Sequence, residues 1–240
     1  MEDNFINEKN IITLLCRKRV KLRQKNRQDN FINSISSINA SPSNMELLNI
    51  LPPRKYWPRP SKKMRIACID YDSMYSKYLS FYVMRQYGDP SVNYTWKDNL
   101  KKFIENCKDK FDNIKSKKIA PERILPIPKN TSYKCKKFRI IATYSLEDSV
   151  FNSLIAKYLS DLIDCKLSNC CYSFRSSSNG VAKTHHDSVR DIMSVTHKIS
   201  KNNPLWVAEC DIKGFFDCIS HNLITSKLEL LSDCDCKILI

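Results

Sequence analysis

The sequence predicts an α+β fold in which a helical N-terminal region precedes a region that contains strands. Apolar side chains at helical spacing indicate helices over residues 70–87 and 96–117. Two strand-like segments, around residues 125–130 and 136–141, flank a polar turn and indicate a hairpin. A short run of strand formers at residues 206–208 then leads into Asp211 and indicates a further strand.

The chain carries a large positive charge for its length. Its 240 residues include 40 Lys and Arg against 25 Asp and Glu, which gives a formal net charge of +15. A field of this size favours polyanionic partners, so we expect nucleic acid or an acidic membrane surface. The length suits one large domain or two modest ones.

The eleven cysteines do not follow the spacing of a disulfide scaffold or a zinc site. Cys170 and Cys171 are adjacent, and no Cys-x-x-Cys pair occurs in the chain. The N-terminus lacks a secretory signal, so we expect reduced thiols and a cytoplasmic location. No stretch approaches the roughly 20 apolar residues of a membrane span, so we expect no transmembrane segment.

The N-terminal half divides by composition into a leader and a second helical region. Residues 1–60 are expected to form a basic helical leader that ends in a proline-rich, non-helical boundary at 51–60. Seven Lys and Arg crowd residues 17–27, and a solvated helix face is the favoured interpretation of that run. Binding of nucleic acid or lipid by this face is the alternative. Residues 61–120 are expected to be helical, with no role indicated.

Three helices are expected after the hairpin. Ser145 and Asp148 form a capping-box-like start to the first, whose buried stripe runs from Val150 to Leu162. The second covers residues 181–200, and the third begins at His221. Two interpretations of Asp211 alone are equally well supported: an aspartate that caps a turn, and a catalytic carboxylate.

Three motifs together resemble the reverse transcriptases. Residues 211–217, Asp-Ile-Lys-Gly-Phe-Phe-Asp, resemble the first catalytic-aspartate motif of that family. Ile127-Pro-Lys129 followed by Arg139 resembles its fingers hairpin, and residues 170–175, Cys-Cys-Tyr-Ser-Phe-Arg, resemble its Ser-Tyr-Gly-Phe-Arg element. They occur in the family's order, and the resemblance is to the bacterial group of retron, group II intron and defence-associated enzymes. It implies that residues 121–240 form the fingers and the first part of the palm of a right-hand polymerase.

The resemblance also implies a role for each motif residue. Asp211 would be the catalytic ligand of a two-metal Mg²⁺ site, with the backbone carbonyl of Ile212 beside it. The implied nucleotide-binding residues are Lys129 and Arg139 on the triphosphate, Arg175 on a phosphate, and Phe216 under the sugar. The basic turn residues Lys134, Lys136 and Lys137 are expected to bind nucleic acid; nine Lys and Arg lie between residues 115 and 139, with one acid, Glu122.

The function implied by the resemblance is RNA-templated DNA synthesis. The partners would be an RNA template, a DNA or RNA primer and deoxynucleoside triphosphates. Polymerases of this family carry a second acidic motif, Tyr-x-Asp-Asp, but no two aspartates are adjacent in this chain. We therefore expect a truncated or front portion, with a downstream polypeptide supplying the rest of the palm. Two alternatives remain: a non-catalytic RNA-binding module derived from a reverse transcriptase, and an RNA-templated RNA polymerase that uses Asp211 and Asp217.

Overall fold

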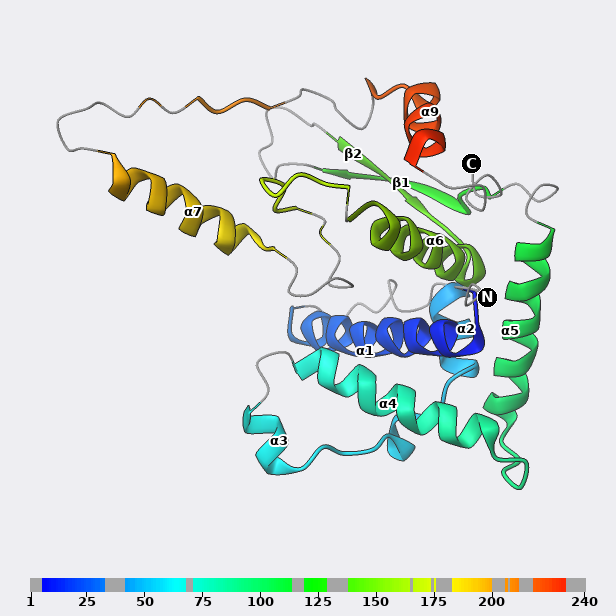
Figure 1. The fold of residues 1–240 in the computed structure, drawn as a ribbon. Coiled ribbons are helices and arrows are strands. Elements are labelled where there is room, and N and C mark those ends of the chain that lie inside the picture. The colour runs from blue at the N-terminus through cyan, green and yellow to red at the C-terminus, as the bar shows by residue number, and fades with distance from the viewer. Residues whose placement is uncertain are drawn as a thin grey trace. The chain divides into compact units, whose positions relative to one another are not determined.

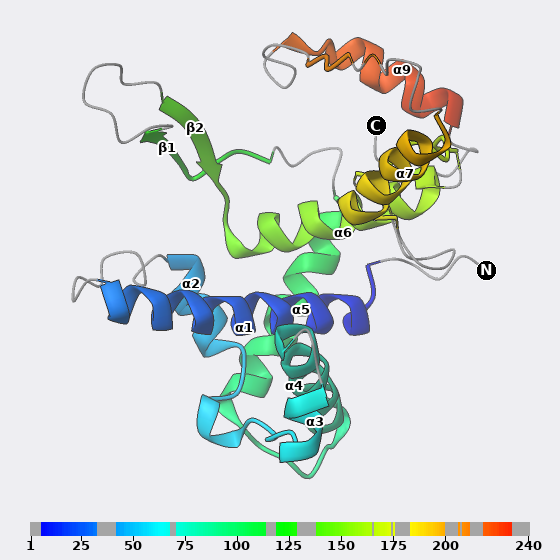
Figure 2. The ribbon, with the colours of Figure 1, turned by 90° about the vertical axis from the view of Figure 1, so that its left-hand side faces the viewer.

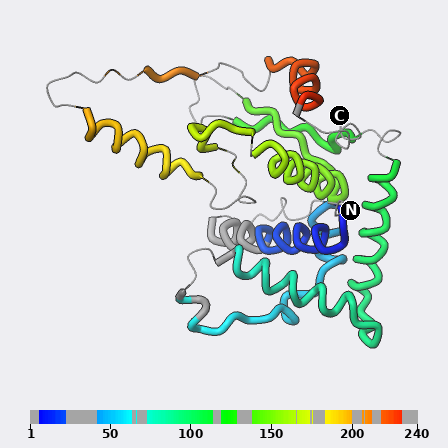
Figure 3. Tube along the Cα trace, viewed as in Figure 1, coloured from blue at the N-terminus to red at the C-terminus, as the bar shows by residue number. Residues whose placement is uncertain are grey.

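The computed structural model divides into two compact units, Met1–Leu154 and Ile155–Ile240. It describes residues 6–32, 42–67, 71–113, 119–128, 138–164, 166–173, 175, 183–199, 206, 208–211 and 218–231. Figure 1 shows the helices and strands, and Figure 3 traces the chain between them.

The described residues are mostly helical, with one two-stranded sheet, and this composition fits the general α+β class. The helices are α1 (Glu8–Ile32), α2 (Pro42–Asn49), α3 (Lys62–Ala67), α4 (Tyr71–Gly88), α5 (Thr95–Asp112), α6 (Leu146–Asp164), α7 (His185–Lys198) and α9 (His221–Leu231). The strands are β1 (Arg123–Pro128) and β2 (Phe138–Thr143). In the part of the chain that is described, no helix is long and apolar enough to cross a membrane.

Helices α4 and α5 confirm the expectation from hydrophobic periodicity at residues 70–87 and 96–117. Residues 114–118, the expected end of the second helix, lie outside the described residues. Figures 1 and 2 show α4 beneath α1, with α5 running crosswise to α1. Helices α1 and α4 are in contact. The fully buried side chains of these three helices include Ile11, Ile12, Leu15, Leu79, Val83, Leu100 and Ile104.

The expectation of a solvated cationic face on α1 holds for Arg17 and Lys21, which are exposed, but Lys18 is half-buried and Arg19 is buried. The side chains of residues 23–27 lie outside the described part of the chain. Arg19 is only 9% exposed, and its guanidinium lies 5.2 Å from the centre of the Trp57 ring. Lys18 donates a 2.6 Å hydrogen bond from Nζ to the hydroxyl of Ser149. Long apolar stems allow lysine and arginine to cover hydrophobic surface, and composition alone does not reveal this. Helix α1 is therefore a core element of the first unit.

The proline-rich segment 51–60 contains no α-helix, as expected, but it does contain a single 3₁₀ turn at Arg54–Tyr56. Proline suits this position because Pro53, with φ of −55°, precedes the first residue of the turn. Trp57 is buried next to the turn and donates a 2.9 Å hydrogen bond from Nε1 to the carbonyl oxygen of Pro52. The segment is thus anchored in the core of the first unit. The division of the chain at residues 60 and 120 stays a prediction.

The expected hairpin is present and leads directly into α6 (Figure 2). β1 and β2 pair antiparallel, with Ile127 opposite Arg139 and Leu125 opposite Ile141. Every residue of both strands is exposed or half-buried. Ser145 then caps α6, as the sequence indicated: its hydroxyl accepts from the backbone N–H of Asp148 at 3.0 Å and donates to the carboxylate of Asp148 at 2.9 Å.

The second unit contains the end of α6, a loop, α7 and α9. Helix α7 begins at His185 within the expected 181–200 range, after a capping box in which Thr184 binds the carboxylate of Asp187 at 2.8 Å. Residues 181–182 lie outside the described residues. Helix α9 begins at His221, as expected.

The described residues before Asp211 do not form the expected strand. Trp206 and residues 208–211 have no strand structure, and Trp206 is 89% exposed; Val207 lies outside the described residues. A strand needs a neighbour to satisfy its backbone hydrogen bonds. Among the described strands, β1 and β2 pair only with each other, so Trp206 and Ala208 have no described strand beside them.

Candidate functional site

Three of the residues implicated by the sequence are described, and they lie on three different segments. Arg139 is on β2, Arg175 is in the loop after α6, and Asp211 precedes α9. Arg139 belongs to the first unit and the other two to the second. The remaining implicated residues lie outside the described part of the chain: Lys129, Lys134, Lys136, Lys137, Ile212 and Phe216.

Arg139 is exposed on the hairpin. Side chains alternate between the faces of a strand, so the register places Arg123, Leu125 and Ile127 of β1 on the same face as Arg139. All four of these residues are exposed. This face therefore combines two guanidinium groups with apolar surface, an arrangement suited to an anionic ligand with an apolar part.

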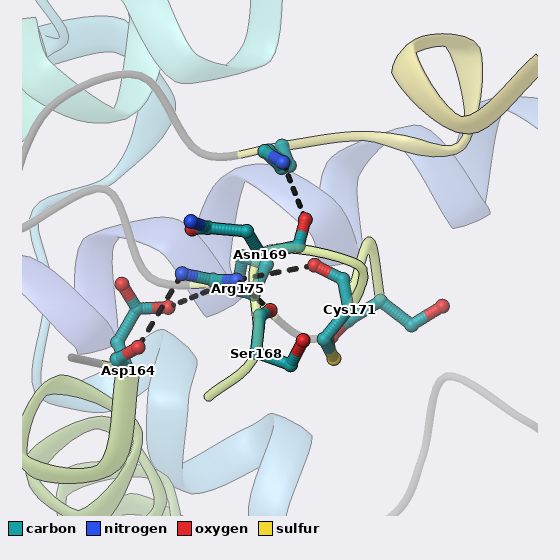
Figure 4. A network of polar contacts seen from close by, with 7 residues as sticks. Asp164, Ser168, Asn169, Cys171 and Arg175 are labelled. Carbon is teal, nitrogen blue, oxygen red and sulfur yellow. Dashed lines mark hydrogen bonds and ion pairs between the residues drawn. The ribbon is translucent and has the colours of Figure 1, made fainter. Parts of the chain in front are cut away.

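Arg175 is held by the loop that precedes it, as Figure 4 shows. Its Nε binds the Asp164 carboxylate at 2.8 Å. One terminal nitrogen donates to the carbonyl oxygens of Ser168 and Cys171, each at 3.1 Å, and the other donates to the Asp164 carbonyl at 3.3 Å. The hydrogen bond to Asp164 raises the pKa of Arg175 further above its ordinary value. All three guanidinium nitrogens are thus engaged in organising the loop.

The same loop is tied to α7. The Tyr172 hydroxyl donates a short hydrogen bond to Asp191 on α7, and this bond raises the pKa of Tyr172 to about 12. Lys183 lies with Nζ 5.0 Å from the centre of the Tyr172 ring and donates a short hydrogen bond to the Asn169 carbonyl. Within the described part of this loop, Arg175, Tyr172 and Lys183 therefore hold residues 166–173 in place.

Sequence reasoning did not identify Asp164 as the partner of Arg175. One signal was present. Asp164 is the last residue of α6 and is buried, and a negative charge at the C-terminal end of a helix is unfavourable unless a cation neutralises it. Whether Arg175 also contacts a phosphate stays a prediction.

Asp211 is exposed and makes no hydrogen bond or ion pair with the described residues. The described residues also contain no group of three His, Cys, Asp or Glu side chains placed to hold a metal ion. Mg²⁺ requires several hard oxygen ligands at fixed positions. One exposed carboxylate does not meet that requirement, so further donors would have to come from outside the described residues.

Comparison of the chain with models of known protein families, with curated proteins and with solved structures finds no match.

Proposed function

We propose that this chain binds RNA and nucleotide as the fingers and the first part of the palm of an RNA-templated DNA polymerase. The proposal rests first on the order of the motifs, from Ile127 to Asp217. The observation that carries it furthest is the exposed hairpin, which presents Arg123 and Arg139 on one face and continues into the capped helix α6. Guanidinium groups on a paired, exposed ladder suit bidentate contact with phosphate oxygens.

Within the proposed role, each residue acts through its own chemistry. Arg139 binds the phosphates of the incoming nucleotide, and Lys129 does so with it. Asp211 supplies one carboxylate to Mg²⁺, which would neutralise charge on the transferred phosphate when bound. Phe216 excludes a 2′-hydroxyl by volume and by offering no hydrogen-bond partner. These 240 residues contain no adjacent pair of aspartates, so the second acidic motif that this proposal requires lies outside them.

A second candidate is a non-catalytic RNA-binding module. Its support is the exposure of Asp211 and of the residues just before it, which form no strand. A module of this kind would use the cationic hairpin without a metal. Both candidates predict RNA binding whose affinity falls with salt, by about 0.7 in log–log slope for each single-strand phosphate neutralised. Salt dependence alone therefore does not separate them.

Retention of nucleotide separates the two candidates. The chain is bound to an RNA template annealed to a DNA primer, and retention of labelled deoxynucleoside triphosphate is measured with and without Mg²⁺. The polymerase proposal predicts Mg²⁺-dependent retention that Asp211→Asn weakens and Glu209→Gln does not. Glu209 is the matched control, because it is an exposed carboxylate on the same segment. RNA binding without nucleotide retention, or nucleotide retention that Asp211→Asn leaves unchanged, would favour the binding module.

A further inference from the structure

The first unit carries a ladder of three aromatic rings in a region for which the sequence indicates no role. The Tyr56 and Tyr94 rings are 6.2 Å apart, and the Tyr94 ring stacks on Trp96 at 5.9 Å. Trp96 is buried, whereas Tyr56 is 44% and Tyr94 37% exposed. The ladder thus begins in the core on α5 and ends at the surface on the 3₁₀ turn.

The surface end of the ladder is rich in cations. Lys55 Nζ lies 4.9 Å from the centre of the Tyr56 ring. Between residues 51 and 69 the chain carries six Lys and Arg and no acid: Arg54, Lys55, Arg59, Lys62, Lys63 and Arg65. Exposed positions among them include Lys55, Arg59 and Lys62. We call Tyr56, Tyr94, Lys55 and Arg59 the aromatic–cation surface.

Both tyrosines are presented on firmly held backbone. Trp57, which follows Tyr56 in the chain, is buried. Its ring donates a hydrogen bond to the Pro52 carbonyl and lies against the guanidinium of Arg19. The loop before Tyr94 is held by Lys97, a buried lysine whose Nζ donates to the carbonyl oxygens of Val92, at 3.2 Å, and of Asp89. The rings therefore lose little freedom when a ligand binds.

Neither tyrosine is buried, and neither is used as a helix cap. Tyr94 occupies the position before the first turn of α5, but its side chain makes no capping hydrogen bond. Tyr56 lies in a turn whose buried residue is its neighbour Trp57. An exposed ring ladder bordered by cations has the features of a platform on which successive bases stack while their phosphates meet lysine and arginine.

We propose that the aromatic–cation surface binds single-stranded nucleic acid. A base stacks on the outer face of Tyr56 and displaces Lys55 from it, because base stacking is the stronger interaction at an exposed ring. Lys55 then moves to a phosphate together with Arg59. This surface is distinct from the cationic hairpin, and binding to it requires neither Asp211 nor Mg²⁺. The inference therefore stands or falls independently of the polymerase proposal.

Binding of a fluorescent oligouridylate to the full chain, measured by anisotropy without Mg²⁺ or nucleotide, tests the inference. We expect Tyr56→Leu and Tyr94→Leu each to weaken binding about fivefold or more, since each removes a stacking ring. Tyr56→Phe should retain affinity because it keeps the ring. Phe81→Leu is the aromatic control: Phe81 is 71% exposed on α4 and makes no ring contact among the described residues.

A matched pair of charge variants separates this surface from the general positive field. Lys55→Gln with Arg59→Gln should weaken binding and lower the salt slope by about 0.7 for each phosphate that these side chains no longer neutralise. Lys101→Gln with Lys102→Gln removes the same charge from exposed positions of α5 and should change affinity less. Equal effects from the two pairs, together with no effect of the tyrosine variants, would overturn the proposal.

Two further probes define the ligand class. Oligothymidylate in place of oligouridylate tests whether the sugar matters, and the tyrosine variants should weaken both if stacking carries the interaction. Vesicles that contain phosphatidylserine test an acidic membrane as the occupant. Binding to vesicles that depends on Tyr56 and Tyr94, with no such dependence for either oligonucleotide, would contradict the inference in favour of a lipid surface.

Discussion

The hydroxyl of Ser145 donates a 2.9 Å hydrogen bond to the carboxylate of Asp148 at the start of α6, just after the end of β2. Asp148 also forms an ion pair with Lys110 of α5, and both of these side chains are largely buried. Through these interactions the start of α6, and with it the end of the hairpin, is fixed to the helical core of the first unit. The hairpin itself is exposed on both faces, and a two-stranded hairpin is at best marginally stable alone.

Loss of the Ser145 cap should destabilise the first unit. Ser145→Ala removes the acceptor for the Asp148 N–H and the donor to its carboxylate, and caps of this kind contribute about 1 kcal/mol. Urea denaturation followed by circular dichroism measures the change. Ser153→Ala is the control, because the Ser153 hydroxyl donates to the Ser149 carbonyl within α6 and caps no helix end. Equal destabilisation by the two variants would contradict the capping role.

Truncation of Leu15 should show that α1 is part of the core rather than a detachable leader. Leu15 is fully buried, and Leu→Ala at such a site costs about 2–5 kcal/mol. Leu48→Ala on α2 is the comparison, since Leu48 is exposed and should cost far less. Thermal denaturation of both variants measures this difference. A Leu15→Ala protein as stable as the wild type would place α1 outside the cooperative unit.

The link between Asp164 and Arg175 should control the accessibility of the loop between α6 and α7. Asp164→Asn removes the charged acceptor of the 2.8 Å bond to Arg175 Nε. We expect faster tryptic cleavage after Lys166 in the absence of nucleic acid. Arg175→Lys should act in the same direction, because a lysine cannot reproduce the forked set of bonds. Unchanged cleavage with weakened RNA binding would instead assign Arg175 to phosphate contact.

Thiol reactivity should follow burial. Burial raises the pKa of Cys107 to about 12 and also raises that of Cys16, whereas Cys170 is exposed. Because the thiolate is the reactive form, iodoacetamide at pH 8 should modify Cys170 well before Cys16 or Cys107, as mass spectrometry can show. Early modification of Cys107 in folded protein would contradict its buried position.

The same shift makes stability depend on pH in a defined direction. A thiol whose pKa is higher in the folded state binds its proton more tightly there than in the unfolded chain. The contribution of Cys107 to stability is therefore complete below about pH 9 and is lost as pH rises toward 12. Cys107→Ala should remove this part of the alkaline loss, measured by urea titration on either side of pH 9. An unchanged alkaline loss in Cys107→Ala would show that other groups carry it.

Local patterns in the sequence were sufficient to predict several elements. Periodicity located α4 and α5, alternation and turn residues located the hairpin, and the Ser145–Asp148 spacing located the start of α6. Features that depend on distant partners were not predictable in this way. The burial of Arg19 depends on Trp57, which is distant in the sequence. The Tyr56 ring, on the 3₁₀ turn, lies against the Tyr94 ring, which precedes α5. Residues 206–208 have strand propensity, but Trp206 and Ala208 have no described strand beside them.

The candidate site was predictable to a similar extent. Sequence motifs selected Arg139, Arg175 and Asp211 by chemical type, and the structure adds that Arg139 and Asp211 are exposed and that Arg175 is engaged by Asp164. The set of acceptors around Arg175 depends on the path of the loop, which no residue pattern specifies. The cations of segment 51–60 were visible in the sequence, but their relation to exposed rings required the fold.

Template-directed nucleotide selection tests the central claim most directly. The chain is bound to RNA template–DNA primer duplexes that differ only in the first unpaired template base, and retention of each labelled deoxynucleotide is measured with Mg²⁺. A polymerase fingers and palm should retain the complementary nucleotide in preference to the other three, and the preferred nucleotide should change with the template base. Arg139→Ala should weaken this retention. Retention that is absent, or that is the same for all four template bases, would contradict the polymerase proposal.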